Sequence, residues 1–205
     1  MLALLLFLSQ ATAQTPVLDE PVAFRAPRDD AEFQRQSSEL QLAATRNAWG
    51  GVERAYRALM TTNVPLTGAM HLCGARAAQS RGDMTAARDR VRQALQAEPE
   101  LQEASDWLRE LDSGYASVLL LGDPGRHQLL ADATPFDPAL AKAIEFARTA
   151  IADTGTFNGI LPAGSYRFAD LTLDVRPGIT TQRIDLRSDR TLRRTEREER
   201  REPRP

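Results

Sequence analysis

The chain has few side chains of the types that catalyse reactions or bind metal ions: one cysteine, Cys73, and two histidines, His71 and His127. A cysteine beside a histidine can act as a nucleophile, and the same two residue types bind Zn²⁺. His71 and Cys73 lie two residues apart in a predicted helix, where their side chains point to different faces, and the sequence offers no second ligand pair. Cys73 shares an apolar helix face with Met70 and Ala77. This spacing favours a buried, inert thiol over a catalytic or metal-binding one.

Two other short motifs have both a chemical and a structural interpretation. Asp29 and Asp30 would suit acid–base chemistry, but nothing nearby supplies a second catalytic group, and acidic residues are also typical of helix N-termini. The motif GDPG at 122–125 has the glycines of a phosphate loop, but it lacks the following Lys-Ser/Thr and is typical of a turn. The sequence contains no Gly-x-Ser-x-Gly, His-Glu-x-x-His or dinucleotide-binding motif. We therefore expect a protein that is not an enzyme and uses no metal or cofactor.

The elements that position these residues are mainly amphipathic helices. In the stretch 77–99, Gly82 ends one helix, Asp83 stands where an N-cap belongs, and Pro99 follows the last apolar residue. Apolar residues recur at helical spacing on one face of the second helix: Met84, Ala87, Val91, Ala94 and Leu95. The stretch 51–61 has the same property, with Val52, Ala55, Tyr56, Leu59 and Met60 on one face. A further helix is expected over 31–47, ending at Gly50-Gly51.

Residues 68–101 resemble a tetratricopeptide repeat, a helix–turn–helix unit of 34 residues with small packing residues and a late proline. The second helix carries the resemblance: Gly82 stands at the turn, Ala87 and Ala94 at the small positions, Val91 at the large apolar position and Pro99 at the end. The first helix departs from the pattern. His71 stands where the family favours Trp, and Gly74-Ala75 and Ala78 replace the usual Leu-Gly and Tyr.

An earlier copy of the pattern supports the repeat. Ala58-Leu59 precedes Ala94-Leu95 by 36 residues, and the helix end at 63–65 precedes the one at 97–99 by 34 residues. A fifth helix is expected over 100–112, with Trp107 packing beside its apolar face, and it would cap the last hairpin. The resemblance implies a concave groove lined by first-helix residues, which here include Leu72, Arg76 and Gln79. The alternative for these three residues is an ordinary solvated helix face.

The pattern changes at Ser113-Gly114. A strand is predicted over 115–121, a possible returning strand over 126–131, and a helix over 137–154, which Asp137 caps and Gly155 follows. Short strands are then expected over 156–161, 165–168, 170–175 and 179–186. The sequence ILPAGSY at 160–166, followed by a strand and Pro177-Gly178, resembles the β-sandwich modules of PEGA-type and carboxypeptidase-regulatory-like domains. The helix over 137–154 is not a usual part of those modules.

These patterns together predict an α+β protein. Antiparallel helical hairpins, about five helices in all, occupy 32–112, and a small antiparallel β module with one packed helix occupies 115–186. Only residues 112–114 separate the two parts, which is too short for a free linker. We therefore expect them to touch, with Trp107 or Tyr115 near the junction.

Composition and the chain ends suggest where the protein resides. The chain has 205 residues, 42% hydrophobic, and a net charge of −2, which gives no electrostatic case for nucleic acid. Residues 1–13 resemble a secretory signal peptide with cleavage after Ala13, and their apolar run is too short to span a membrane.

Residues 14–31 contain three prolines and are interpreted as a linker. The tail 187–205 has eight arginines and five acidic residues, which predicts disorder.

The sequence as a whole favours an exported, non-enzymatic protein of the cell envelope that binds a protein or peptide partner and acts in interaction or scaffolding. The alternative is a β module that binds glycan or cell wall, with the helices as a spacer. Exposed aromatic side chains would distinguish the two, because sugar-binding sites need such platforms. The candidates are Tyr115, Phe136, Phe146, Phe157, Tyr166 and Phe168. An enzyme would require Cys73 to be exposed beside a histidine.

Overall fold

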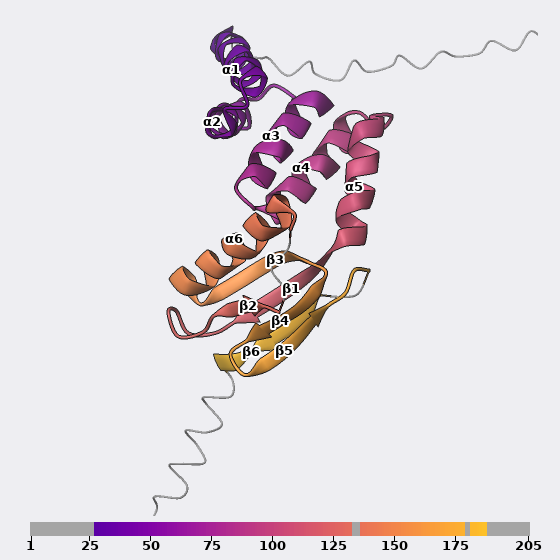
Figure 1. Cartoon of the computed structure of the whole chain (residues 1–205). Helices are drawn as coiled ribbons and strands as arrows, with labels where there is room; N and C mark the ends of the chain where they lie inside the picture. The colour runs from indigo at the N-terminus through magenta and orange to yellow at the C-terminus, as the bar shows by residue number, and fades with distance from the viewer. Residues whose placement is uncertain (1–26, 133–135, 179–180, 188–205) are drawn as a thin grey trace, which may run out of the picture.

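The computed structural model describes residues 27–132, 136–178 and 181–187, and its fold is α+β, as the sequence predicts. Helices form one end of the molecule and strands the other, with helix α6 lying between them (Figure 1). The predicted signal peptide, residues 14–26 of the predicted linker and residues 188–205 of the predicted tail lie outside the described residues. Within the described part, no helix is both long enough and apolar enough to cross a membrane.

Five helices form the N-terminal part. They are α1 (Pro27–Thr45), α2 (Trp49–Leu59), α3 (Gly68–Ser80), α4 (Met84–Ala97) and α5 (Gln102–Gly114). Helices that are neighbours in sequence pack together, so that α1 and α2 form one hairpin, α3 and α4 a second, and α5 packs against α4. Short connections make such neighbours antiparallel.

The turn from α3 to α4 has the structure that its residues predict. Gly82 adopts a left-handed conformation with φ of 82°, which glycine reaches without steric cost. The Asp83 carboxylate accepts a hydrogen bond from the Ala86 backbone N–H at 3.0 Å and so caps α4. Pro99 follows the end of α4, as predicted.

The first hairpin differs from the prediction at both of its boundaries. Helix α1 begins at Pro27, so residues 27–31 of the predicted linker are helical. The chain turns at Asn47, whose φ is 52°, and Gly50-Gly51 lies inside α2 instead of breaking the chain. Asparagine tolerates this conformation, which explains why the turn falls there. A Cβ on Gly51 would lie only 3.1 Å from the Ala43 Cβ, so this glycine allows α1 and α2 to approach closely.

Helix α5 continues directly into a strand. It ends at Gly114 and not near Leu111, so the predicted three-residue connection is the last turn of the helix. This turn is held from both sides, because Arg88 of α4 forms an ion pair with Asp112, and the carbonyl of Gly114 accepts a hydrogen bond from the Ala163 N–H at 2.9 Å.

Two three-stranded sheets and α6 (Pro138–Thr154) form the C-terminal part. The strands are β1 (Tyr115–Leu121), β2 (Leu129–Ala131), β3 (Thr156–Pro162), β4 (Gly164–Phe168), β5 (Leu171–Val175) and β6 (Gln182–Asp185). One sheet has the order β3-β1-β6 and the other β2-β4-β5.

The prediction of an all-antiparallel β module is wrong in one respect. Strand β1 pairs antiparallel with β3 but parallel with β6. Strand β2 does not return beside β1 and pairs with β4 in the second sheet. Alternation of apolar residues shows which face of a strand is buried but not the direction of its neighbour, so the sequence pattern could not distinguish these pairings.

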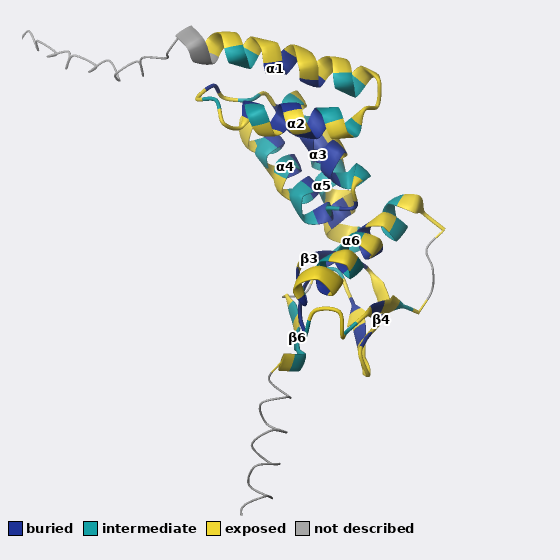
Figure 2. Cartoon of the chain, turned by 90° about the vertical axis from the view of Figure 1, so that its left-hand side faces the viewer, coloured by how far each residue is buried: buried dark blue, intermediate teal, exposed yellow. Residues whose placement is uncertain are grey.

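The two parts share a hydrophobic core. The cluster formed by α3, α4 and α5 includes Ala143 of α6 and Ile160 of β3, with Tyr115 packed against it. The Thr85 hydroxyl in the first turn of α4 accepts a hydrogen bond from the Ile160 backbone N–H at 3.1 Å. Buried residues accordingly continue from the helices into α6 and β3 (Figure 2). The predicted contact between the two parts is therefore present, with Tyr115 beside it.

Candidate functional site

His71 lies in a buried polar network that its position in the sequence does not reveal. Its side chain is 9% exposed, and its Nδ1 lies 2.9 Å from the hydroxyl of Tyr56 on α2. That hydroxyl donates to Oε1 of Gln93 on α4 at 3.1 Å. Burial, and next the charge of Arg90, lower the pKa of His71 below its usual value. His71 is therefore neutral at pH 7. Its hydrogen bond to Tyr56 joins α3 to α2, and the Tyr56 hydroxyl extends the network to Gln93 of α4.

Glu53 is the charged centre of the same region. Its carboxylate is buried and forms ion pairs with Arg90 of α4 at 2.6 Å, Arg57 at 2.7 Å and Arg81 at 3.2 Å. Burial raises the pKa of Glu53, but hydrogen bonds and charge from Arg90, Arg81 and Arg57 outweigh it and hold the pKa at about 2. Glu53 stays ionised and links the first hairpin to the second.

Arg90 completes the network. Its guanidinium donates to the Gly74 carbonyl at 2.7 Å and lies over the Tyr56 ring, 4.5 Å from the ring centroid. A Cβ on Gly74 would come 2.6 Å from the Tyr56 ring, so glycine is needed for this approach. The network thus combines one buried carboxylate, the three arginines that pair with it and a neutral histidine. Its chemistry is that of a buried structural junction between α2, α3 and α4.

Cys73 is half-buried and packs against the core of the first hairpin. Burial raises the pKa of its thiol, opposed in part by the charge of Arg76 and reinforced by Glu103. The thiol is therefore protonated at neutral pH, and no contact joins it to His71 in the described structure. Within the described residues, no three His, Cys, Asp or Glu side chains gather where they could hold a metal ion.

The three predicted partner-binding residues occupy different environments. Leu72 is 4% exposed in the core shared by α3, α4 and α5, so its side chain is unavailable to a partner. Arg76 is exposed, forms an ion pair with Glu103 of α5 and lies 5.9 Å from the centroid of the Trp107 ring. Gln79 is half-exposed on α3. We call Arg76, Gln79, Glu103 and Trp107 the Arg76 surface. The sequence predicts Trp107 as a packing residue of the cap or of the junction, and not as part of a binding surface.

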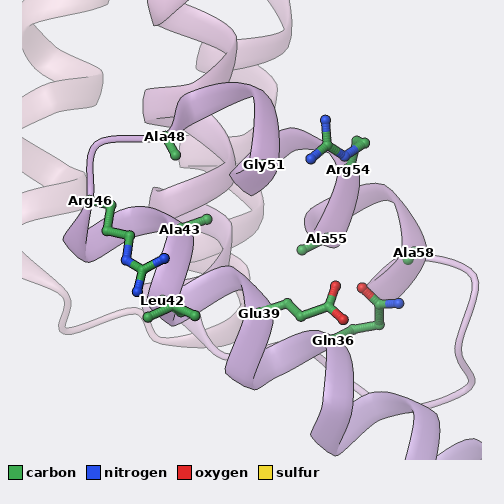
Figure 3. Close-up of a pocket in the computed structure, with 10 residues that line it drawn as sticks. All are labelled: Gln36, Glu39, Leu42, Ala43, Arg46, Ala48, Gly51, Arg54, Ala55 and Ala58. Atoms are coloured by element: carbon green, nitrogen blue, oxygen red, sulfur yellow. The ribbon is translucent and has the colours of Figure 1, made fainter.

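A shallow groove of about 410 Å³ runs between α1 and α2 (Figure 3). Small side chains line much of it, and polar or charged side chains lie along its edges. Its lining residues are Gln36, Glu39, Leu42, Ala43, Arg46, Ala48, Gly51, Arg54, Ala55 and Ala58. We call it the α1–α2 groove. It shares no residue with the Arg76 surface.

The second histidine lies in the C-terminal part. His127 packs edge-to-face on Phe168, with ring centroids 5.9 Å apart, beside a hollow of about 390 Å³ between β2 and α6. Arg148 of α6 borders this hollow and donates to the Leu129 carbonyl of β2 at 2.8 Å. Among the six aromatic residues considered for sugar binding, Phe136 is exposed, whereas Tyr115 and Phe146 are half-buried and the other three are buried. Of these six residues, Phe136 therefore has the one exposed ring.

The remaining motifs have structural roles. Residues 29 and 30 both lie in the first turn of α1, and the exposed Asp30 is an acidic residue at the end of the helix that the dipole favours. In the GDPG turn, the Gly122 N–H donates to the Gly155 carbonyl at 2.7 Å and the Gly125 N–H to the Ala152 carbonyl at 3.0 Å. These N–H groups bind the end of α6 and do not point at a phosphate site. Comparison with known proteins finds no matching family model, no matching curated protein and no matching solved structure.

Proposed function

We propose that this is a non-enzymatic interaction protein of the cell envelope, which binds a protein or peptide through the Arg76 surface and so acts as a scaffold. The single observation that carries this proposal is the position of Arg76, which lies over Trp107 and beside Glu103. Arginine and tryptophan are the residue types that most often dominate the energy of protein interfaces. Here one of each, from two different helices, forms one accessible surface.

The Arg76 side chain is available for a partner. The Arg76 side chain is 52% exposed and that of its partner Glu103 is 54% exposed. An exposed ion pair of this kind contributes little to the stability of the fold. A partner carboxylate can therefore replace Glu103 at small cost. The Trp107 ring is half-buried, so its orientation is set before binding and little side-chain entropy is lost.

The surrounding helices support a rigid binding surface. The Glu53–Arg90 ion pair and the Tyr56–His71 hydrogen bond join α2, α3 and α4, and the shared core joins α3 to α5. The resemblance to tetratricopeptide repeats favours the same surface, because in that family the first helix of each hairpin lines the groove. In this chain those helices are α1 and α3, and α5 packs beside the second hairpin.

Affinity capture from an envelope extract tests the proposal. The wild-type protein is compared with Arg76→Glu and with the control Arg92→Glu, which reverses a similarly exposed arginine (47%) on α4. We expect wild type and Arg92→Glu to retain the same partner, and Arg76→Glu to lose most of it. Equal capture by Arg76→Glu and Arg92→Glu would contradict a role for the Arg76 surface.

The cellular location is part of the proposal and rests on the leucine-rich run and the Ala-Thr-Ala site in residues 1–13. Mass spectrometry of the protein from its native host should find Gln14 as the first residue, in the envelope fraction. An intact N-terminus on cytoplasmic protein would overturn the proposed export without affecting the proposed binding surface.

A further inference from the structure

Strand β2 lies at one end of its sheet, whose order is β2-β4-β5. The Asp132 N–H, directly after β2, donates to the Ser165 carbonyl of β4 at 3.0 Å. Hydrogen-bonded and non-bonded pairs alternate along an antiparallel ladder, so in this register Leu130 is the next residue bonded to β4. Leu129 and Ala131 therefore direct their backbone N–H and C=O groups away from β4, to the side where a further strand would lie.

A side chain of α6 takes the place of such a strand at one of these groups. Arg148 donates from Nε to the outward carbonyl of Leu129 at 2.8 Å, which is the hydrogen bond that an N–H of an added strand would make. The Arg148 side chain is 40% exposed, and its ion pair with the exposed Glu145 is long, at 3.6 Å. Such a pair contributes little, so an incoming backbone N–H can replace Arg148 at small cost.

The hollow of about 390 Å³ between β2 and α6 lies beside this edge, and we call it the β2–α6 hollow. The edge of β3, in the other sheet, is occupied by contrast. The outward N–H of Ile160 donates to the Thr85 hydroxyl at 3.1 Å. Pro162 has no N–H, and its carbonyl accepts a hydrogen bond from the Tyr166 hydroxyl at 2.8 Å. Of these two edges, β2 therefore has both outward backbone groups and space beside them.

We propose that the β2–α6 hollow binds an extended peptide of a partner, which adds to the outer edge of β2 as a further strand and carries a basic side chain. Exposed sheet edges bind extended peptides in this way, through main-chain hydrogen bonds. The peptide replaces Arg148 at the Leu129 carbonyl and also bonds to the outward groups of Ala131. A side chain of the peptide then packs beside Leu130, a large apolar residue that is 40% exposed.

The charges around the hollow favour the basic side chain. Glu145 and Asp153 both line it and are exposed. Within the described part of the chain, no ion pair involves Asp153. This residue lies in the last turn of α6, which ends at Thr154, and the C-terminal end of a helix carries the negative end of its dipole. An acidic peptide side chain would meet two carboxylates and this dipole, whereas a lysine or arginine complements them.

The first experiment pans a phage-displayed library of random peptides, each about ten residues long, on the full chain. We expect the enriched peptides to share a basic residue, and Asp153→Lys to weaken binding of the selected peptide by about tenfold. The control Asp170→Lys changes an exposed aspartate outside the hollow and should bind like wild type. Arg76→Glu should also bind like wild type, so the result is independent of the Arg76 surface. No enrichment, or equal binding by the two lysine variants, would overturn the proposal.

The second experiment tests addition as a strand. Ala131→Pro removes an outward N–H at an edge position, where proline is tolerated, and should weaken binding by about tenfold. The matched control is Thr172→Pro on β5. Thr172 faces Arg167, which bonds to β2, so its N–H also points out of the sheet; this variant should bind like wild type. Circular dichroism confirms that both are folded.

Methylation of the peptide's backbone amides, one at a time, gives a measurement that needs no variant of the protein. An added strand directs every second N–H toward β2, so methylation should weaken binding at alternate amides only. Binding by Ala131→Pro equal to that by Thr172→Pro, or a methylation effect without this alternation, would overturn the proposal.

Discussion

Gly82, in the turn between α3 and α4, lies directly against α6: a Cβ atom on this residue would come 2.2 Å from the carbonyl oxygen of Lys142. The two residues are far apart in sequence and belong to different parts of the molecule. Their contact, together with the Thr85–Ile160 hydrogen bond, shows that the second helical hairpin packs directly against α6 and β3. The two parts therefore pack directly against each other.

Replacing Gly82 with alanine should destabilise the protein by roughly 2–4 kcal/mol, because the new Cβ meets main-chain atoms and φ is 82°. The control is Gly50→Ala, since nothing lies within 4 Å of a Cβ at that position and the residue is in α2. Alanine should be neutral or slightly stabilising there. Urea unfolding measures both changes. A loss of less than about 1 kcal/mol for Gly82→Ala would mean that α6 is not packed against the turn.

Thermal unfolding should be a single cooperative transition, because Ala143 and Ile160 of the C-terminal part belong to the core of α3, α4 and α5. Scanning calorimetry should give a calorimetric enthalpy equal to the van't Hoff enthalpy. Circular dichroism in the far and near ultraviolet should report the same midpoint. Two resolved transitions would show that the helical part and the β module unfold independently.

Stability should decrease on mild acidification because of His71. Its pKa is lowered in the folded state, so the unfolded chain binds the proton more readily. The contribution of neutral His71 is fully present above pH 6.5 and is lost as the pH falls from there toward the lowered pKa. Urea unfolding at pH 7.5 and pH 5 should show this loss in wild type and in His127→Asn, and a smaller loss in His71→Asn. Equal losses in all three proteins would contradict the assignment.

Replacing Glu53 with glutamine should lower the free energy of unfolding by about 3 kcal/mol. The uncharged glutamine would leave Arg90 and two further arginines without their buried acidic partner. The control Glu103→Gln breaks an exposed pair with Arg76 and should cost less than about 1 kcal/mol. The Glu53 contribution should also depend on pH. Since its pKa is about 2, well below the usual value, the stabilisation is present above about pH 4.5 and is lost as the pH approaches 2. A Glu53→Gln variant as stable as Glu103→Gln would contradict this account.

Local chemistry explains what the sequence predicted well. Asp83, Asp137 and Gly155 act through their nearest neighbours, so the bounds of α4 and α6 follow from the residues themselves. The turn at Asn47 was missed because Gly50-Gly51 is the stronger local signal. Gly51 instead serves the packing of α1 on α2, which a local pattern does not reveal.

Contacts between distant residues explain what the sequence did not predict. Glu53 and Arg90 are 37 residues apart, and each one alone resembles an ordinary surface charge on a helix. The parallel pairing of β1 with β6 likewise depends on how the chain crosses between two sheets. Leu72 was assigned to a binding surface by analogy with first-helix positions, but its direction is set by packing against α4 and α5. The sequence contains one indication of the Arg76 surface. Trp107 lies in the predicted capping helix, and a tryptophan there is large enough to reach the preceding hairpin.

Photo-crosslinking in the native host tests the central proposal, partner binding at the Arg76 surface, most directly. A photoreactive amino acid is placed at Gln79 on that surface and, in a second strain, at Arg92 on α4. After irradiation, the account predicts a discrete adduct of higher mass from position 79 and none from position 92. Adding Arg76→Glu should abolish the adduct. No adduct from position 79, or the same adducts from both positions, would contradict the proposal that this surface binds the partner.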